Sequence, residues 1–522
     1  MPSHSFQGSN PNQSPQTLAA IDIGSNAIRL AVAQVLPSGE VEMLEHLQRA
    51  VRLGHDTFRR GKLSPESLRS AVNILRDFRR VLELYQARRV RAVATSAVRE
   101  ATNADAFLDR VSMATGLHVE IIGTAEESCL MVSAVCHSLG DEFFRDRERL
   151  LVVEVGGGST LLTVLEGRTV HNFRSARLGS IRMQELLGVT EEPRLHAGAL
   201  LRRYIAKVVA ALEGTVDFTG IGKLIAVGAD ARFAAREVGS PTSFSQLYCV
   251  PAAALAQLVE RCQPLSVERL SREYALPLAE AETIVPALLV YQQLLNRVGS
   301  PEMFVSFVSM RDGLILDLAR ELLGQEDPFL AEGVRRAAEA IAARYGADLQ
   351  HARTVRDLCV RIFTELQSEH QLGYRERLLL EVAALLHEIG GFVSSQAHHK
   401  HSFYLISNTE IFGLNRLETQ IVAHVARYHR RSGPKPSHLE YMALPESARM
   451  IINKLAAILR VADALSRVQL PRETQLGIKR LRDELVITVP SPVDRLLERQ
   501  TMAFKGGLFE EIFGLRIRLE EM

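Results

Sequence analysis

The chain has no tryptophan, only five cysteines, and aromatic residues make up just 6% of its 522 residues. So few aromatic side chains argue against a surface that stacks nucleic-acid bases or sugar rings. The cysteines have neither the spacing of a metal site nor that of a disulfide framework, and an odd, sparse set suits a reducing compartment. They are Cys129, Cys136, Cys249, Cys262 and Cys359.

The chain also lacks an excess of charge and a long apolar run. Its formal net charge is +1, so no overall field attracts nucleic acid or a membrane, and any polyanion site must be local. No apolar run approaches the roughly 18–20 residues of a membrane span. Residues 1–17 are rich in Ser, Asn, Pro and Gln, which predicts a disordered tail instead of a signal peptide. We therefore expect a cytoplasmic protein.

Two stretches of the sequence repeat one pattern. Residues 18–35 are LAAIDIGSNAIRLAVAQV and residues 150–167 are LLVVEVGGGSTLLTVLEG. In each, an apolar run ends in an acid, Asp22 or Glu154, passes a Gly/Ser turn and returns through a second apolar run, which predicts a β-hairpin. Glycines allow a ligand to approach the backbone, and successive N–H groups form an anion-binding concavity. Two such hairpins are suited to hold one phosphate between two similar half-domains.

The glycines fit neither of two common nucleotide-binding loops. A Walker A loop is excluded, because no G-x-x-x-x-G-K-[ST] occurs. The contiguous glycines lead into an apolar run and not into a helix, so a Rossmann fingerprint fits badly. Either hairpin alone fits an ordinary Gly turn, but the paired acids and the GGGST run make coincidence a poor account.

The remaining pattern predicts an α/β fold followed by a helical region. Ser64 is placed to cap a helix that has Pro65 at its first position and apolar residues at helical spacing. Strands and helices alternate to about residue 322, the pattern is almost all helical from about 331 to 470, and strand-like runs with a helix near 493–505 follow.

At this point the sequence resembles the exopolyphosphatase/guanosine pentaphosphate phosphohydrolase (Ppx/GppA) family. The resemblance covers about residues 18–470 and is carried by several segments together: IDIGSNAIRL, RLG with GKLSP, AVATSAVREATNADAFL, the EES helix start, GGGST, ARLGSIRM, VSMRDGLILDL and LLHEIG with HKHSFYLI. It implies two actin-like domains of the ribonuclease H-like, sugar-kinase/Hsp70/actin superfamily, then an all-helical HD-like domain and a small α+β terminus. The expected boundaries are 1–17, 18–130, 131–322, 328–470 and 471–522.

The resemblance implies hydrolysis of the terminal phosphoanhydride of inorganic polyphosphate, with release of orthophosphate. Guanosine pentaphosphate is the alternative substrate. Two different classes of function stay open, a sensor that only binds polyphosphate or guanosine tetraphosphate and a nucleotide phosphohydrolase of the HD type. A homodimer is the family expectation.

The resemblance also implies roles for individual residues. Glu127 is the expected general base, with Glu126 as runner-up, and Arg99 is the expected phosphate contact; Arg29 is a weaker candidate. The residues expected to bind phosphate are Gly24, Ser25, Asn26, Gly156, Gly157, Gly158, Ser159 and Thr160.

Asp22 and Glu154 are the expected carboxylates of a Mg²⁺ (or Mn²⁺) site, since Mg²⁺ prefers a few carboxylates, waters and phosphate oxygens. Here the chain departs from the family. Glu154 stands where the family has Asp, Leu161 where it has Glu, and the later Gly-Gly-Thr turn is Gly228-Ala229-Asp230. We therefore expect a weakened metal shell and activity that needs more Mg²⁺ than the family norm or shifts toward Mn²⁺.

The helical region carries a second set of residues, spread as in HD-type phosphohydrolases, in which His-Asp is replaced by His387-Glu388. It either binds a metal or is structural. The set is His351, His387, Glu388, His401, His424, His429 and Asp463. A basic cluster, RYHRRSGPKPSH with HHKH at 398–401, is either a track for long polyphosphate or a solvated loop.

Overall fold

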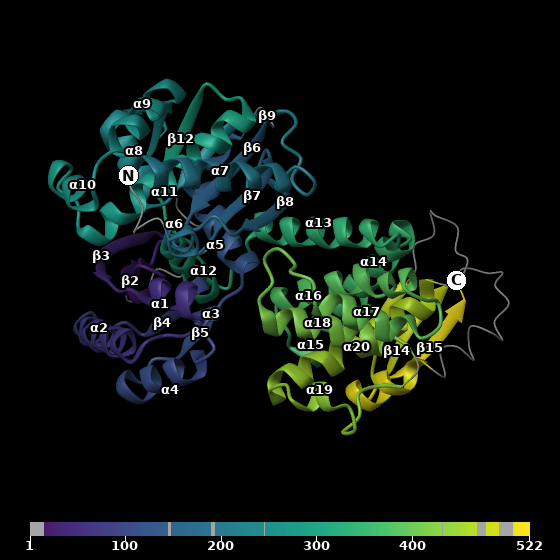
Figure 1. The fold of residues 1–522 in the computed structure, drawn as a ribbon. Helices are drawn as coiled ribbons and strands as arrows, with labels where there is room; N and C mark the ends of the chain where they lie inside the picture. Colours follow the sequence, from purple (N-terminus) through teal and green to yellow (C-terminus); the bar gives the residue numbers. More distant parts are fainter. Residues whose placement is uncertain are drawn as a thin grey trace. The chain divides into compact units, whose positions relative to one another are not determined.

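The computed structural model describes residues 15–144, 148–188, 194–244, 246–430, 432–466, 477–489 and 505–521. The chain divides into two compact units, Met1–Leu330 and Ala331–Met522 (Figure 1). Residues 1–14, most of the expected N-terminal tail, lie outside the described part, and so does most of the helix expected near 493–505.

The first sheet of unit 1 begins with the predicted hairpin. Its strands lie in the order β3-β2-β1-β4-β5, and β1 pairs antiparallel with β2 so that Asp22 lies opposite Arg29. β4 runs parallel to β1 on its other side. The strands are β1 (Gln16–Ile23), β2 (Ala27–Val35), β3 (Val41–Ala50), β4 (Arg89–Ala94) and β5 (Val119–Ile121).

The second sheet repeats this plan. The second hairpin, β6 with β7, continues into β8, and β9 runs parallel to β6 as β4 does to β1. The full order is β10-β11-β12-β9-β6-β7-β8. The strands are β6 (Arg149–Val155), β7 (Thr160–Glu166), β8 (Thr169–Ala176), β9 (Ile221–Val227), β10 (Ser240–Pro241), β11 (Leu247–Pro251) and β12 (Glu302–Ser306). The predicted duplication of the hairpins is confirmed.

Helices cover both sheets of unit 1 (Figure 1). They are α1 (Leu53–Arg60), α2 (Pro65–Leu84), α3 (Ser96–Arg99), α4 (Ala104–Thr115), α5 (Thr124–Phe143), α6 (Ser180–Leu187), α7 (Arg194–Leu212), α8 (Ala229–Val238), α9 (Ala252–Cys262), α10 (Val267–Glu273), α11 (Leu278–Val298) and α12 (Met310–Leu323).

Helix α2 shows how the local sequence determines its element. The Ser64 hydroxyl accepts a hydrogen bond from Ser67 N at 3.2 Å, and Pro65 occupies the first turn, so the predicted cap is confirmed. The apolar face predicted from helical spacing is buried in the core of the first sheet; for example, Leu75 and Phe78 are 0% and 1% exposed. Burial of one such side chain contributes about 1.5–3 kcal/mol.

Two helices do not follow a division of unit 1 at residue 130. Helix α5 spans Thr124 to Phe143 with a kink at Gly140, so the expected boundary between 130 and 131 falls inside its first, unbroken part. Helix α12 packs against α5, β1 and β2. The segment that follows the last strand of the second sheet therefore returns to the first sheet and brings residues near 309–312 close to the first hairpin.

Unit 2 is mostly helical. Its buried core includes apolar residues of α14, α16, α18 and α20, which pack against one another. The helices, of which the first begins before the unit boundary, are α13 (Pro328–Arg344), α14 (Leu349–Glu365), α15 (Gln367–His370), α16 (Tyr374–Leu386), η1 (Ile389–Phe392), α17 (His398–Ser407), α18 (Arg416–Tyr428), α19 (Leu439–Met442) and α20 (Glu446–Ser466).

A small sheet at the C-terminus matches the expected strand-like runs. Its order is β13-β14-β15, with β13 (Gly477–Leu481) antiparallel and β15 (Arg516–Glu521) parallel to β14 (Glu484–Val489). No single helix of the described residues is long and apolar enough to cross a membrane; the bent pair α10 and α11 meets the length and composition test only when taken together.

Candidate active site

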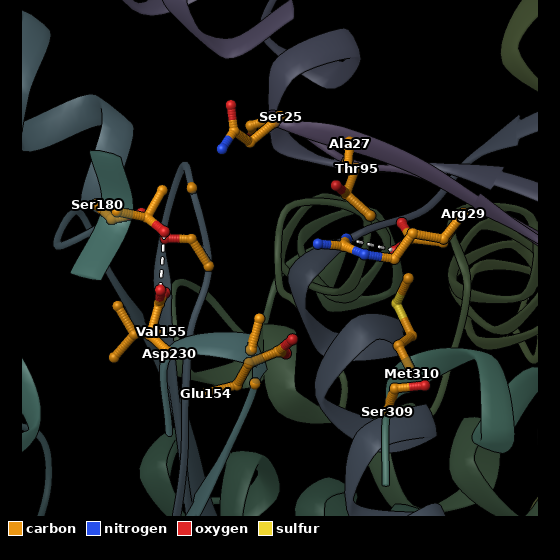
Figure 2. Close-up of a pocket in the computed structure, with 18 of the residues that line it drawn as sticks. Ser25, Ala27, Arg29, Thr95, Glu154, Val155, Ser180, Asp230, Ser309 and Met310 are labelled. Atoms are coloured by element: carbon orange, nitrogen blue, oxygen red, sulfur yellow. Dashed lines mark hydrogen bonds and ion pairs between the residues drawn. The ribbon is translucent and has the colours of Figure 1, made fainter. Parts of the chain in front are cut away.

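A cleft of about 560 Å³ opens where the two hairpin turns of unit 1 face each other (Figure 2). Both acids at the strand ends, Asp22 and Glu154, line it, as does Glu127 from the first turn of α5. Of the residues expected to bind phosphate, Gly24, Ser25, Asn26, Gly156, Gly157, Gly158 and Ser159 also line this cleft. The fold therefore brings together most of the residues that the sequence singles out.

The turns offer backbone donors to the cleft. Gly24 N and Gly156 N close their own hairpins by donating to Ala27 O at 3.0 Å and to Ser159 O at 2.9 Å. Within the described part of the chain, the next N–H groups in each turn, at Ser25 and Asn26 and at Gly157 and Gly158, donate to no protein acceptor. Consecutive N–H groups of this kind form an anion-binding concavity.

Two glycines of the GGGST run are required by packing between the halves of unit 1. A β-carbon at Gly157 would lie 2.8 Å from the Ser25 β-carbon, and one at Gly158 would lie 2.6 Å from a ring carbon of Phe58. Both distances are too short for real atoms. Besides allowing a ligand to approach the backbone, these glycines therefore let the second turn approach the first.

Side chains add to this contact between the halves. Asn26 Nδ2 donates to Ala279 O at 2.5 Å, so the amide that was expected to bind phosphate instead joins the first turn to the start of α11. Thr160 also differs from expectation. Its side chain is fully buried, and its hydroxyl donates to Leu178 O at 2.9 Å, because the side chain at this register of β7 points away from the cleft.

His55 forms a buried charged bridge across the same boundary. Its Nδ1 lies 2.6 Å from Glu185 of α6, and its Nε2 lies 3.4 Å from Glu282 of α11. Burial alone would lower the pKa of His55, but the neighbouring carboxylates of Glu282 and Glu185 outweigh it and raise that pKa above 6.5.

This bridge predicts that unit 1 loses stability as pH rises through neutrality. Because the folded pKa of His55 is above its unfolded value of 6.5, the stability that the bridge contributes is complete below pH 6.5 and is lost as pH rises through the folded pKa. Urea unfolding measured over pH 6–9 should therefore have a smaller slope against pH for His55→Gln than for wild type. The exposed His46→Gln variant is the control, and equal slopes for wild type and His55→Gln would contradict the role of His55.

The two acids at the start of α5 have different surroundings. Glu127 faces the cleft, and its Oε1 accepts from Arg99 Nη1 at 3.1 Å. Glu126 faces away and pairs with Arg91 Nη2 at 2.5 Å; Arg91 also contacts Asp317. The geometry thus favours Glu127 over Glu126 as the group that meets a substrate.

Arg99 is placed differently from the expectation that it contacts phosphate. Its Nη1 donates to Ile122 O at 2.5 Å as well as to Glu127, and Arg99 is absent from the described residues that line the cleft. An arginine held in this way fixes the orientation of the Glu127 carboxylate.

The acids of the cleft repel one another. Asp22 is paired with Arg29 at 3.3 Å. Burial, together with the charges of Glu127 and Asp22, raises the pKa of Glu154 to about 8. Carboxylates brought together in this way form the kind of ligand set that a hard divalent cation accepts, so these residues fit the expected Mg²⁺.

Three arginines form the positive side of the cleft. Arg29, Arg232 of α8 and Arg311 of α12 all line it. Burial and the charge of Arg29 lower the pKa of Arg311 to about 10, and the same causes lower that of Arg232. Arg311 Nε is buried without a hydrogen-bond partner. Three guanidinium groups that repel one another are suited to bind the oxygens of a phosphate.

Sequence reasoning missed Arg232 and Arg311. Each lies in the first turn of a helix that follows a parallel strand of the second sheet, β9 for Arg232 and β12 for Arg311. The ends of adjacent parallel strands meet at one edge of a sheet. An arginine soon after each strand was therefore the sequence feature that could have predicted these two site residues. For Arg311 this feature is not enough, because its place in the cleft also depends on the packing of α12 against the first sheet.

The departures from the family pattern lie beside these charges. Leu161 lines the cleft, is 5% exposed and pairs across the hairpin with Glu154. Asp230, in the altered turn, accepts from the Thr283 hydroxyl at 2.7 Å, and burial raises the pKa of Asp230 to about 6. Leu161 and Glu154 are therefore neighbours on one wall of the cleft.

In unit 2, part of the HD-type set converges. His351, His387, Glu388 and Asp463 have ligand atoms within 4.8 Å of one another. His429 is next to His387, with ring centroids 5.0 Å apart. Neither His401 nor His424 belongs to the four-residue group that the described residues form.

The basic cluster of unit 2 is only partly a surface. His398 and His399 are 9% and 7% exposed, and His429 is fully buried, so these residues contribute little to a track for a polyanion. Arg430 Nη1 lies 3.3 Å from His398 Nδ1, while Arg431 lies outside the described residues. The described part of the cluster therefore exposes fewer basic side chains than the sequence predicts.

Comparison with known proteins gives matches along most of the chain. The model of the Ppx/GppA phosphatase family matches residues 31–322, and that of Ppx/GppA phosphatase domain III matches residues 334–503. The guanosine-5′-triphosphate,3′-diphosphate pyrophosphatase of Photobacterium profundum is 26% identical over 450 residues, 85% of this chain and 84% of that protein. The protein of the same name from Aeromonas hydrophila is 28% identical over 484 residues, 91% and 92% of the two chains.

Solved structures agree on the fold. An exopolyphosphatase from Cytophaga hutchinsonii superposes with a TM-score of 0.53 at 21% identity, covering 59% of this chain and 98% of that one. An exopolyphosphatase-like protein gives a TM-score of 0.51 at 24% identity, covering 60% and 100%. The predicted fold class, two actin-like domains followed by a helical region, is confirmed.

Proposed function

Because the chain belongs to the Ppx/GppA phosphatase family, we propose that its cleft hydrolyses the terminal phosphoanhydride at the 5′ end of guanosine pentaphosphate and releases orthophosphate. The family makes the chain a hydrolase of phosphoanhydrides, and the names of the relatives support this substrate. The observation that carries the proposal is that Glu127, three arginines and two sets of turn amides line one cleft.

Inorganic polyphosphate, the substrate that the sequence favours, ends in the same bond and stays a second prediction. The names of the full-length relatives favour the guanosine nucleotide instead. A cytoplasmic location and a homodimer also stay predictions.

The chemistry follows from the charges of the cleft. The turn amides at Ser25 and Gly157 and the guanidinium of Arg311 bind the oxygens of the terminal phosphoryl group and offset their charge. Glu127, held by Arg99, orients a water and accepts its proton as the water oxygen bonds to phosphorus. The anhydride bond breaks, the shortened phosphate chain leaves with the electron pair, and the proton passes from Glu127 to the products.

A divalent cation has a place in this arrangement. Asp22 and Glu154 would hold Mg²⁺, and the bound ion would neutralise charge on the phosphate oxygens. Asp22 also pairs with Arg29, and burial raises the pKa of Glu154 to about 8, so a bound cation would compete with Arg29 and with a proton for these carboxylates.

Orthophosphate release from guanosine pentaphosphate and from long-chain polyphosphate, each with Mg²⁺, tests the proposal. We expect a higher kcat/KM for the nucleotide. A higher kcat/KM for polyphosphate would make the chain an exopolyphosphatase. Binding of either compound without hydrolysis at any Mg²⁺ or Mn²⁺ concentration would show that the protein is a sensor and not an enzyme.

Leu161 gives a separate prediction for the metal. A carboxylate at position 161 would lie across the strand pair from Glu154 and add charge and an oxygen ligand to the shell. Leu161→Glu should therefore lower the Mg²⁺ concentration that gives half-maximal phosphate release. Leu161→Gln, similar in size but uncharged, is the matched control and should not lower it. Coinciding Mg²⁺ titrations for wild type and a folded Leu161→Glu variant would show that position 161 has no metal role.

A further inference from the structure

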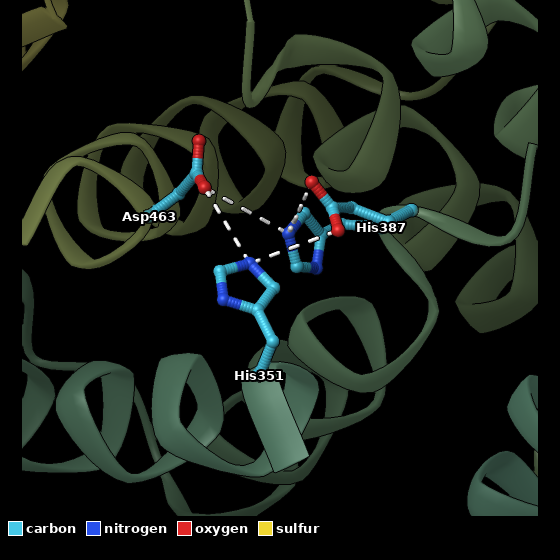
Figure 3. Close-up of side chains that lie close together, drawn as sticks. His351, His387 and Asp463 are labelled. Carbon is cyan, nitrogen blue, oxygen red and sulfur yellow. Dashed lines mark ion pairs between the residues drawn. The ribbon is translucent and has the colours of Figure 1, made fainter. Parts of the chain in front are cut away.

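A second candidate site lies in unit 2, where four potential ligands from three helices converge (Figure 3). His351 lies in the first turn of α14, His387 and Glu388 follow the end of α16, and Asp463 lies near the end of α20. Among the described residues, this is the one group of three or more His, Cys, Asp or Glu side chains whose ligand atoms all lie within 4.8 Å.

His387 presents an unprotonated nitrogen to the centre of this group. His387 Nδ1 lies 2.7 Å from Ala384 O, and because a carbonyl only accepts, Nδ1 carries the proton and Nε2 keeps its lone pair. His387 is fully buried, and its Nε2 has no hydrogen-bond partner. His351 Nε2 is likewise buried without such a partner. A buried polar atom without a partner is unfavourable, and a bound ion would satisfy it.

The spacing of the ligand atoms suits a small cation. His351 Nε2 lies 3.7 Å from Glu388 Oε2 and 4.0 Å from Asp463 Oδ1. His387 Nε2 lies 4.0 Å from Glu388 Oε1 and 3.9 Å from Asp463 Oδ1. An ion at the centre of a regular tetrahedron with edges of this length lies about 2.4 Å from each ligand atom. Zn–N and Zn–O bonds are about 2.0–2.2 Å long, so the ligand atoms need to move inward by only a few tenths of an ångström.

We propose that His351, His387, Glu388 and Asp463 form a binding site for a divalent first-row transition metal, with Zn²⁺ the best match. Two imidazoles and two carboxylates are a donor set for such an ion, while Mg²⁺ and Ca²⁺ prefer oxygen ligands alone. The carbonyl of Ala384 supplies the outer hydrogen bond that orients a metal-binding histidine. The bound ion would tie α14, α16 and α20 together.

Lys505 is the competing cation. Its Nζ pairs with Asp463 Oδ2, so one oxygen of this carboxylate already forms an ion pair. The other oxygen, Oδ1, is the one that faces both histidines. Since an ammonium group at Oδ2 satisfies neither imidazole nitrogen, the lysine and a metal have separate places on Asp463. If Lys505 alone neutralises Asp463 and the group binds no metal, the proposal is wrong.

Metal content of the full chain tests the site. The protein is stripped with a chelator, then dialysed against Zn²⁺ in excess Mg²⁺, and bound zinc is measured together with the unfolding temperature. Wild type should hold about one zinc per chain and unfold at a higher temperature with it. His387→Gln and His351→Gln should weaken zinc binding by more than about tenfold, since loss of an outer hydrogen bond alone costs that much.

The controls separate ligand loss from misfolding and from the cleft of unit 1. His424→Gln is the matched control, because His424 is fully buried with both ring nitrogens unpartnered but lies outside the group. His424→Gln and Asp22→Asn should keep the zinc. His351 is partly exposed, so His351→Gln is expected to fold even if His387→Gln does not.

No bound zinc in wild type, or zinc that survives in both His351→Gln and His387→Gln, would overturn the site. Loss of zinc in Asp22→Asn would place the ion in the cleft instead. These measurements do not use phosphate release, so they stand apart from the proposed function.

Discussion

Glu127→Gln is expected to lower the turnover of phosphate release by about 10²–10⁴, the usual contribution of a positioned acid–base group. The substitution keeps the shape of the side chain and its contact with Arg99, but it removes the group that accepts a proton from water. Substrate binding should be retained, because the turn amides and the arginines are unchanged. Steady-state kinetics with guanosine pentaphosphate and Mg²⁺, together with equilibrium binding to the inactive variant, measure both effects.

Glu126→Gln is the matched control, one residue away on the same helical turn. Its carboxylate pairs with Arg91 on the side away from the cleft, so its loss should reduce stability and leave turnover within a fewfold of wild type. Near-normal turnover in Glu127→Gln with a large loss in Glu126→Gln would reverse the assignment.

Arg311→Met is expected to weaken substrate affinity and, at the same time, to stabilise the substrate-free protein. Arg311 is half-buried and lines the cleft with Arg29 and Arg232, and its buried Nε has no protein acceptor. Hydrogen bonds to charged groups contribute about 1.5–3 kcal/mol, so affinity should fall about 10- to 100-fold. Without substrate, the loss of a partly desolvated cation that Arg29 repels should raise the unfolding temperature.

The opposite signs of the two effects make this prediction specific. A residue that only supports the fold would lower stability when removed and would change affinity indirectly. Arg80→Met, on an exposed face of α2, is the control and should change neither quantity. If Arg311→Met lowers the unfolding temperature and keeps wild-type affinity, Arg311 is not part of the phosphate site.

The sequence was most informative where local chemistry determines structure. The paired hairpins at Asp22 and Glu154 and the cap at Ser64 were predicted because strand periodicity, turn glycines and capping side chains act over a few residues. The resemblance to the family then supplied the order of the domains, which no local pattern contains.

The other features of the site could not be predicted, because only the folded chain determines where a side chain points and which distant segments meet. Thr160 adjoins the cleft turn in sequence, yet its hydroxyl bonds to Leu178 O, and Arg99 bonds to Ile122 O and to Glu127 instead of lining the cleft itself. Arg311 reaches the cleft because α12 packs on the sheet of the other half, a contact across about 290 residues of chain that spacing cannot reveal. The second and third glycines of GGGST likewise serve a contact between halves that is invisible in either hairpin alone.

The most direct test of the account is hydrolysis of guanosine pentaphosphate in water enriched in heavy oxygen, with the label located by mass spectrometry. Attack by a water held at Glu127 on the terminal phosphorus predicts one labelled oxygen in each released orthophosphate and none in the guanosine tetraphosphate product. Label in the nucleotide, or release of pyrophosphate in place of orthophosphate, would contradict cleavage of the terminal phosphoanhydride in this cleft.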